Sequence, residues 1–228
     1  MTVEIARWTD EFEAANTELA ARSERFLQGL LARGDLHIRF MNTLSRLEQM
    51  GSQRIFATQS GAAMDEETLR HLAEETRHAW FFRQQAERLA KQPLDYAASS
   101  LLAPASAAMY FKKLEATIAR PQQSGLPVRG IYLYMSLVIE FRAVWFYRLY
   151  QRALSEAGIA VSLRSLLAEE SSHLKGMLRA LRQIDADLPR RLDAFLLTEQ
   201  KLYTRLLRAL EEQLDASPAE TARLAAAG

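Results

Sequence analysis

The sequence predicts an all-α protein. Apolar residues recur at the three- and four-residue spacing of an amphipathic helix over several long segments. Glycine and proline stand between these segments, where they end one helix and allow the next to begin. No run of alternating polar and apolar residues, flanked by turn residues, indicates a strand. We therefore expect a bundle of long helices.

The first part of the chain predicts three helices. Helical periodicity over about 3–33 ends at Gly34, and a second helix follows over about 36–59. Asp65 and the acidic residues after it suit the positive end of a helix dipole, so a third helix begins there. This helix runs to about Lys91 and is stopped by Pro93.

The middle of the chain, residues 93–125, contains no long periodic stretch. A short helix over about 105–120 follows Pro104, and Pro121 and Pro127 then interrupt the chain. A long crossover between two parallel helices of a bundle would lie here.

Three further helices follow the crossover. The segment over about 128–157 is the most apolar and aromatic part of the chain, and Gly158 ends it. Ser162 is the predicted N-cap of the next helix. These helices are expected over about 128–157, 162–184 and 189–215. We expect a single helical domain over residues 1–216, with a bundle core at about 36–185, and a flexible tail over 217–228.

The composition excludes several kinds of function. The chain has 228 residues, 49% of them hydrophobic, and a formal net charge of +1. This charge gives no strong attraction to nucleic acid or to a membrane. The absence of cysteine excludes disulfides, thiolate catalysis and iron–sulfur clusters. No apolar segment follows Met1 as in a signal peptide, so a cytoplasmic location without a membrane partner is expected.

Two copies of a Glu-x-x-His pair are the strongest functional signal. Glu75 and His78 form one pair, and Glu170 and His173 form the other. Residues three apart share one face of a helix, so each pair directs a carboxylate and an imidazole to one point. A lone glutamate stands about one helical hairpin before each pair, and these two are Glu48 and Glu140. The chain thus contains two sets of the same form, and carboxylate and imidazole are ligands that suit iron or manganese.

The alternative explanation is that these pairs arose by chance or form surface ion pairs. The position of Glu140 favours the metal explanation, because Val138, Ile139 and Phe141 surround it in the most apolar helix. An uncompensated carboxylate at such a position would be costly, and a bound cation would balance its charge.

With this order of ligands, residues 36–185 resemble the ferritin-like di-iron carboxylate superfamily. The resemblance implies a four-helix bundle with a long crossover between its second and third helices and with extra N- and C-terminal helices. It implies two iron ions, with manganese or a mixed pair as alternatives. By this resemblance one ion is held mainly by Glu48, Glu75 and His78, the other mainly by Glu140, Glu170 and His173, with one or two glutamates bridging.

Two further residues have open roles. His71 lies on the same face as Glu75 and His78, and some di-iron N-oxygenases of the superfamily carry a similar extra ligand histidine. The alternative is a histidine one turn above the metals that only hydrogen-bonds to a ligand or is exposed to solvent. Tyr147 shares the face of Glu140 and is either a donor near the metals or an ordinary buried aromatic residue.

The resemblance leads us to expect an enzyme that activates O2 to oxidise or hydroxylate a small organic substrate, with an external electron donor. A ferroxidase, a rubrerythrin-like peroxidase and a metal-free helical scaffold remain alternatives. The aromatic helix would suit a homodimer interface as well as a substrate pocket, so a homodimer is also left open.

Overall fold

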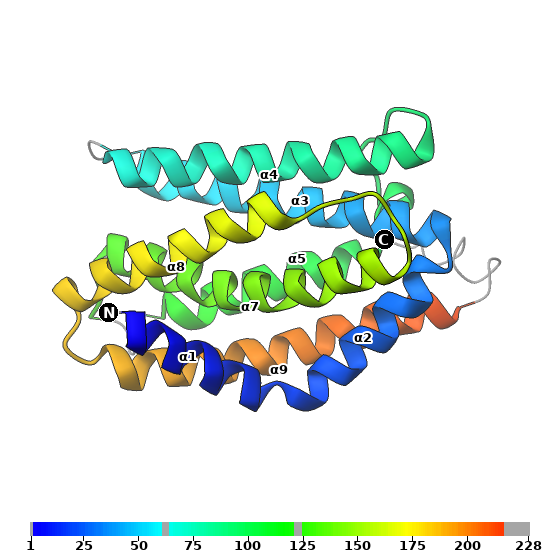
Figure 1. The fold of residues 1–228 in the computed structure, drawn as a ribbon. Coiled ribbons are helices and arrows are strands. Elements are labelled where there is room, and N and C mark those ends of the chain that lie inside the picture. Colours follow the sequence, from blue (N-terminus) through cyan, green and yellow to red (C-terminus); the bar gives the residue numbers. More distant parts are fainter. Residues whose placement is uncertain (1, 61–63, 121–124, 217–228) are drawn as a thin grey trace. The chain divides into compact units, whose positions relative to one another are not determined.

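The computed structural model describes residues 2–60, 64–120 and 125–216, and the regular elements in these ranges are helices (Figure 1). No strand occurs in them, so the predicted all-α class is confirmed. Pro121 and the predicted tail over 217–228 lie outside the described residues.

The helices lie close to the predicted segments. Their bounds are α1 (Thr2–Ala15), α2 (Thr17–Leu31), α3 (Gly34–Gln59), α4 (Glu66–Ala90), the 3-10 helix η1 (Ala98–Ser100), α5 (Pro104–Ile118), α7 (Val128–Glu156), α8 (Arg164–Ile184) and α9 (Leu188–Asp215).

The single helix expected over 3–33 is wrong in one respect, because a break at Asn16 divides it into α1 and α2. Asn16 is buried, and its side-chain nitrogen donates to the carbonyl of Phe12 at 2.8 Å. Its side-chain oxygen accepts a hydrogen bond from Arg142 at 2.7 Å. The side chain of Asn16 thus shares the Phe12 carbonyl with the backbone nitrogen of Asn16, and a side chain that competes for helical hydrogen bonds in this way favours a break.

The ends of α4 agree with the sequence. The side chain of Asp65 accepts a hydrogen bond from the backbone nitrogen of Thr68 at 2.8 Å, as an N-cap residue does. At the other end Lys91 adopts the left-handed conformation, with a φ of 55°. This residue turns the chain out of the helix two positions before Pro93.

The start of α8 differs from the prediction. Gly158 ends the turn after α7 with a φ of 66°, as expected for a glycine there. Ser162, however, is not the N-cap of α8, because Leu163 occupies that position. The backbone nitrogen of Leu163 donates instead to the side chain of Gln151 at 2.6 Å. A side chain from α7 thus binds the start of α8, where the sequence predicts a serine cap.

The chain divides into two compact units. Of the described residues, unit 1 contains those up to Arg25 together with Phe111–Thr204. Unit 2 contains Phe26–Tyr110 and the residues from Arg205 onward. The single domain expected over 1–216 stays a prediction.

Unit 1 is built on the pairing of α7 with α8, and α1 also packs on α7 (Figure 1). The aromatic residues of α7 are buried, as the sequence indicates. The rings of Phe12 and Phe141 stack with their centroids 5.7 Å apart. The hydroxyl of Tyr134 donates to Asp185 at 2.7 Å, so this buried phenol has a partner for its polar end.

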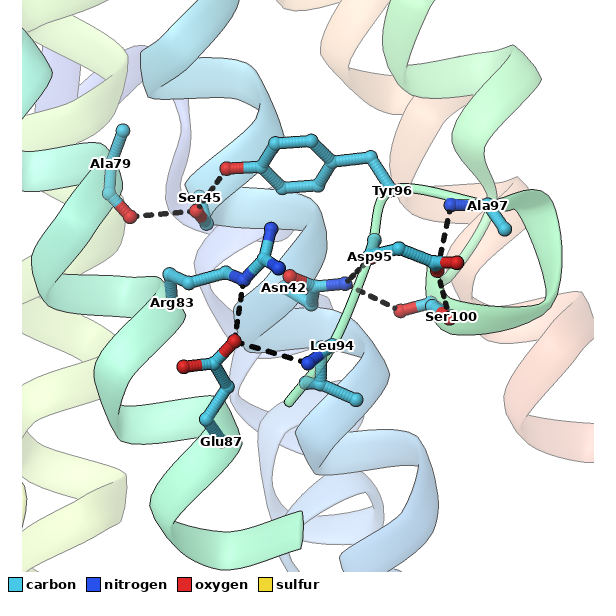
Figure 2. Close-up of polar contacts among 10 residues, drawn as sticks. All are labelled: Asn42, Ser45, Ala79, Arg83, Glu87, Leu94, Asp95, Tyr96, Ala97 and Ser100. Carbon is cyan, nitrogen blue, oxygen red and sulfur yellow. Dashed lines mark hydrogen bonds and ion pairs between the residues drawn. The ribbon is translucent and has the colours of Figure 1, made fainter. Parts of the chain in front are cut away.

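Unit 2 is built on the hairpin of α3 and α4, which lie side by side (Figure 1). The segment after α4 is tied to this hairpin by polar contacts (Figure 2). The side-chain nitrogen of Asn42 donates to the carbonyls of Asp95, at 2.7 Å, and Ser100, at 3.0 Å. The backbone nitrogen of Leu94 donates to Glu87 at 3.0 Å. Side chains of both helices therefore hold the segment in place.

Three aromatic residues follow one another on α4, and the sequence predicts most simply that they pack in the core and between helices, or that they line an apolar pocket. They are Trp80, Phe81 and Phe82, and Phe82 is fully buried. Trp80, however, is 60% exposed. Successive residues are about 100° apart around a helix, so Trp80 and Phe82 lie on nearly opposite sides of α4. The three aromatic residues therefore cannot all face the core.

Among the described residues, no helix combines the length and the apolar character needed to cross a membrane.

Candidate metal sites

The first candidate set lies on the α3–α4 hairpin of unit 2. Glu48 comes from the middle of α3, and Glu75 and His78 come from the middle of α4. Each of the three offers one oxygen or nitrogen atom, and these atoms lie within 4.8 Å of one another. Glu75 and His78 are buried, and Glu48 is half-buried. The i,i+3 spacing on α4 and the pairing with α3 therefore bring the three predicted ligands together.

His71 lies beside Glu75, a member of this set. Its Nε2 atom lies 3.2 Å from Oε1 of Glu75, and the His71 side chain is only 6% exposed. This distance suits a hydrogen bond that holds the carboxylate in place, and it also suits two neighbouring ligands of one ion. The solvent-exposed position considered for His71 is wrong, because the side chain is buried, and the ligand and hydrogen-bonding roles remain open.

The second candidate set lies on the α7–α8 hairpin of unit 1. Nδ1 of His173 lies 2.8 Å from an oxygen of Glu170 and 3.3 Å from an oxygen of Glu140. Both carboxylates are almost fully buried, with relative exposures of 1% for Glu170 and 3% for Glu140. One imidazole nitrogen thus faces two carboxylates in an apolar helical hairpin.

The two sets differ in which histidine lies beside the glutamate of the Glu-x-x-His pair. In unit 1, Glu170 contacts His173, three residues after it on α8. In unit 2, an oxygen of Glu75 lies beside His71, four residues before it on α4. Helix α8 has Leu166 at the position that corresponds to His71. The same sequence motif therefore gives two different local arrangements.

The donor chemistry of both sets fits a metal ion. Each set offers carboxylate oxygens and an imidazole nitrogen from mid-helix positions, and these are ligands that iron, manganese and zinc accept. Every residue predicted as a metal ligand lies in one of the two sets. Tyr147 is buried two turns after Glu140 on α7, with its ring centroid 6.2 Å from that of Phe146. Its role near the metal stays a prediction.

The structure adds Gly51, which sequence reasoning did not identify. A side-chain carbon at this position would lie 2.9 Å from Oε2 of Glu75. The signal in the sequence is a glycine one turn after Glu48, inside a helix where glycine is unfavourable.

No family model, curated protein or solved structure matches the chain.

Proposed function

We propose that the protein is a di-iron carboxylate oxidoreductase that activates O2 to oxidise or hydroxylate a small organic substrate. The observation that carries this proposal is the second set, in which two almost fully buried carboxylates lie within 3.3 Å of one imidazole nitrogen. A set of the same residue types on the α3–α4 hairpin supports a second ion. A ferritin-like bundle topology with a crossover after α4 is part of the proposal.

In this proposal each set holds one ion. A pair of ferrous ions bound in such sites would supply electrons for the reduction of O2, and an external donor would restore them. The protein residues hold and orient the ions, and their burial keeps bulk water away from them. Glu48, Glu75 and His78 would bind one ion, and Glu140, Glu170 and His173 would bind the other.

The first experiment is a measurement of metal content after anaerobic loading with ferrous iron. Two iron ions per chain are expected. Glu140→Ala and Glu170→Ala are each expected to reduce the content to one ion or fewer, because each removes a buried ligand. Glu169→Ala is the matched control, since Glu169 is the half-buried neighbour of Glu170 on α8 and is not a member of the set. Circular dichroism shows whether each variant keeps its helices.

Two outcomes would contradict the metal sites. Less than a tenth of an ion per chain in the wild-type protein would leave a helical scaffold. Full metal content in both Glu140→Ala and Glu170→Ala would overturn the ligand assignment. Mössbauer spectra then show whether the two ions are magnetically coupled, as the di-iron assignment requires. Uncoupled high-spin ions would argue for two separate sites.

Oxygen uptake tests the activity itself. The reduced, loaded protein is expected to consume O2 without free ferrous iron in solution, and repeatedly if an electron donor is present. Uptake that occurs only in proportion to added ferrous iron would favour a ferroxidase instead.

A further inference from the structure

Gly51 stands at a crowded position inside α3. It lies one turn after Glu48, and a side-chain carbon built there would be 2.9 Å from Oε2 and 3.9 Å from Cδ of Glu75. Contacts below 3.0 Å essentially do not occur for real side-chain carbons. The Glu75 carboxylate therefore occupies the space that any other residue at position 51 would fill.

Backbone conformation does not explain this glycine. Among the described glycines, those with a left-handed backbone are Gly125 and Gly158. Gly51 lies inside a regular helix, where glycine is less favourable than any residue except proline. The glycine at position 51 is thus explained by the room that its missing side chain leaves for the Glu75 carboxylate.

The two oxygens of Glu75 have different neighbours. Oε2 lies in the space beside Gly51, and Oε1 lies 3.2 Å from Nε2 of His71. The second set has neither feature, because Ala143 stands one turn after Glu140 and Leu166 stands one turn before Glu170. There the motif carboxylate contacts His173 instead. Gly51 and His71 thus occur together beside Glu75, and Glu170 has no counterpart of either.

We infer that Gly51 is a positioning residue: the missing side chain lets the Glu75 carboxylate turn toward His71 and gives the first set a ligand arrangement that the second set lacks. This inference rests on the proposed function, because it takes Glu75 as a metal ligand. Its consequence is that a methyl group at position 51 impairs the binding of metal by Glu75.

The test is Gly51→Ala, with Gly34→Ala as its matched control. Gly34 lies in the same helix, and nothing lies within 4 Å of a side-chain carbon built there. In ferrous-ion titrations, Gly51→Ala is expected to weaken the binding of the ion or ions that Glu75 holds by about 10- to 100-fold, as changes beside metal ligands do. Gly34→Ala should keep the wild-type affinity for both ions. Equal wild-type affinities in Gly51→Ala would overturn the inference.

A second measurement uses the metal-free protein, so it does not depend on the proposed function. Alanine is the better helix former, so Gly51→Ala is expected to raise the unfolding temperature by about 2–4 °C when Glu75 is also alanine. With Glu75 present the rise should be smaller, because the carboxylate must leave its position. The same rise in both backgrounds would show that the two residues do not interact, even if the wild-type protein binds iron. A wild-type protein that binds no iron but shows the difference would overturn the proposed function and keep the Gly51–Glu75 contact.

Discussion

Arg142 and Glu140 show how one apolar helix carries two buried charges. The two residues are about 200° apart around α7, so their side chains leave the helix on opposite sides. Glu140 reaches His173 on α8. Arg142 donates to both carboxylate oxygens of Glu199, at 2.8 and 2.9 Å. The ring centroids of three aromatic residues lie 4.1–4.7 Å from the guanidinium carbon of Arg142. These residues are Phe12, Trp145 and Tyr203.

The difference between these two charges bears on function. The two-pronged contact between Arg142 and Glu199 matches the geometry of guanidinium and carboxylate, and the opposite charges balance. Glu140 and Glu170 instead both lie within 3.3 Å of Nδ1 of His173. Of the two clusters, the one around His173 is therefore the one with the carboxylate and imidazole donors of a metal site.

His37 predicts an acid-sensitive contribution to stability. It is 2% exposed on α3, and burial lowers its pKa from 6.5 to about 4. The unfolded chain therefore takes up a proton near pH 6.5, whereas the folded protein does so only near pH 4. The contribution of neutral, buried His37 to the free energy of unfolding is therefore complete above pH 6.5 and is lost as the pH falls toward 4. At pH 5 this loss is about 2 kcal/mol of the free energy of unfolding.

Urea unfolding of the metal-free protein at pH 7 and pH 5 measures this effect. The variant His37→Gln cannot take up the proton, so it should lose less stability between the two pH values than the wild-type protein does. Other titrating groups are common to both proteins and cancel in the difference. Equal losses in both proteins would show that His37 titrates normally in the folded state.

At the scale of elements, Tyr96 fastens the segment after α4 to the α3–α4 hairpin (Figure 2). Its hydroxyl lies 2.8 Å from that of Ser45, which in turn donates to the carbonyl of Ala79 at 2.6 Å. The guanidinium carbons of Arg46 and Arg83 lie 5.4 and 4.9 Å from its ring centroid. One tyrosine thus contacts residues of both helices close to the first metal set.

Two substitutions separate the contributions of the hydroxyl and the ring. Tyr96→Phe keeps the ring and loses the hydrogen bond, which should cost about 1 kcal/mol. Tyr96→Ala also loses both arginine contacts and should cost about 2–3 kcal/mol. Hydrogen exchange of the amide of Leu94 is expected to speed up more in Tyr96→Ala than in Tyr96→Phe. Unchanged exchange in Tyr96→Ala would mean that Asn42 and Glu87 hold the segment without the tyrosine.

The sequence predicts what depends on local order along the chain. Helical periodicity places α3, α4, α7 and α8 within about two residues of their observed bounds. The i,i+3 spacing places each Glu-x-x-His pair on one face of its helix. The break at Asn16 was missed because one of its partners, Arg142, is 126 positions away. The space beside Gly51 was missed for the same reason, since it depends on how α3 packs against α4.

At the scale of the whole molecule, the boundaries between the two units fall inside helices. Helix α2 passes from unit 1 to unit 2 after Arg25, α5 passes between them after Tyr110, and α9 does so after Thr204. If one unit unfolded alone, each of these helices would be cut and would expose backbone groups at a new end. Helix formation is cooperative, so such cuts are unfavourable. The units are therefore not expected to unfold independently.

We predict that the metal-free protein unfolds in a single thermal transition. For a chain of this length the enthalpy of that transition should be about 150 kcal/mol near 60 °C. Differential scanning calorimetry provides the test, because the calorimetric and van't Hoff enthalpies agree only when the whole chain unfolds as one unit. Two peaks, or a van't Hoff enthalpy near half the calorimetric value, would show that the units are separate domains. A single peak with equal enthalpies would support the single domain that the sequence predicts over residues 1–216.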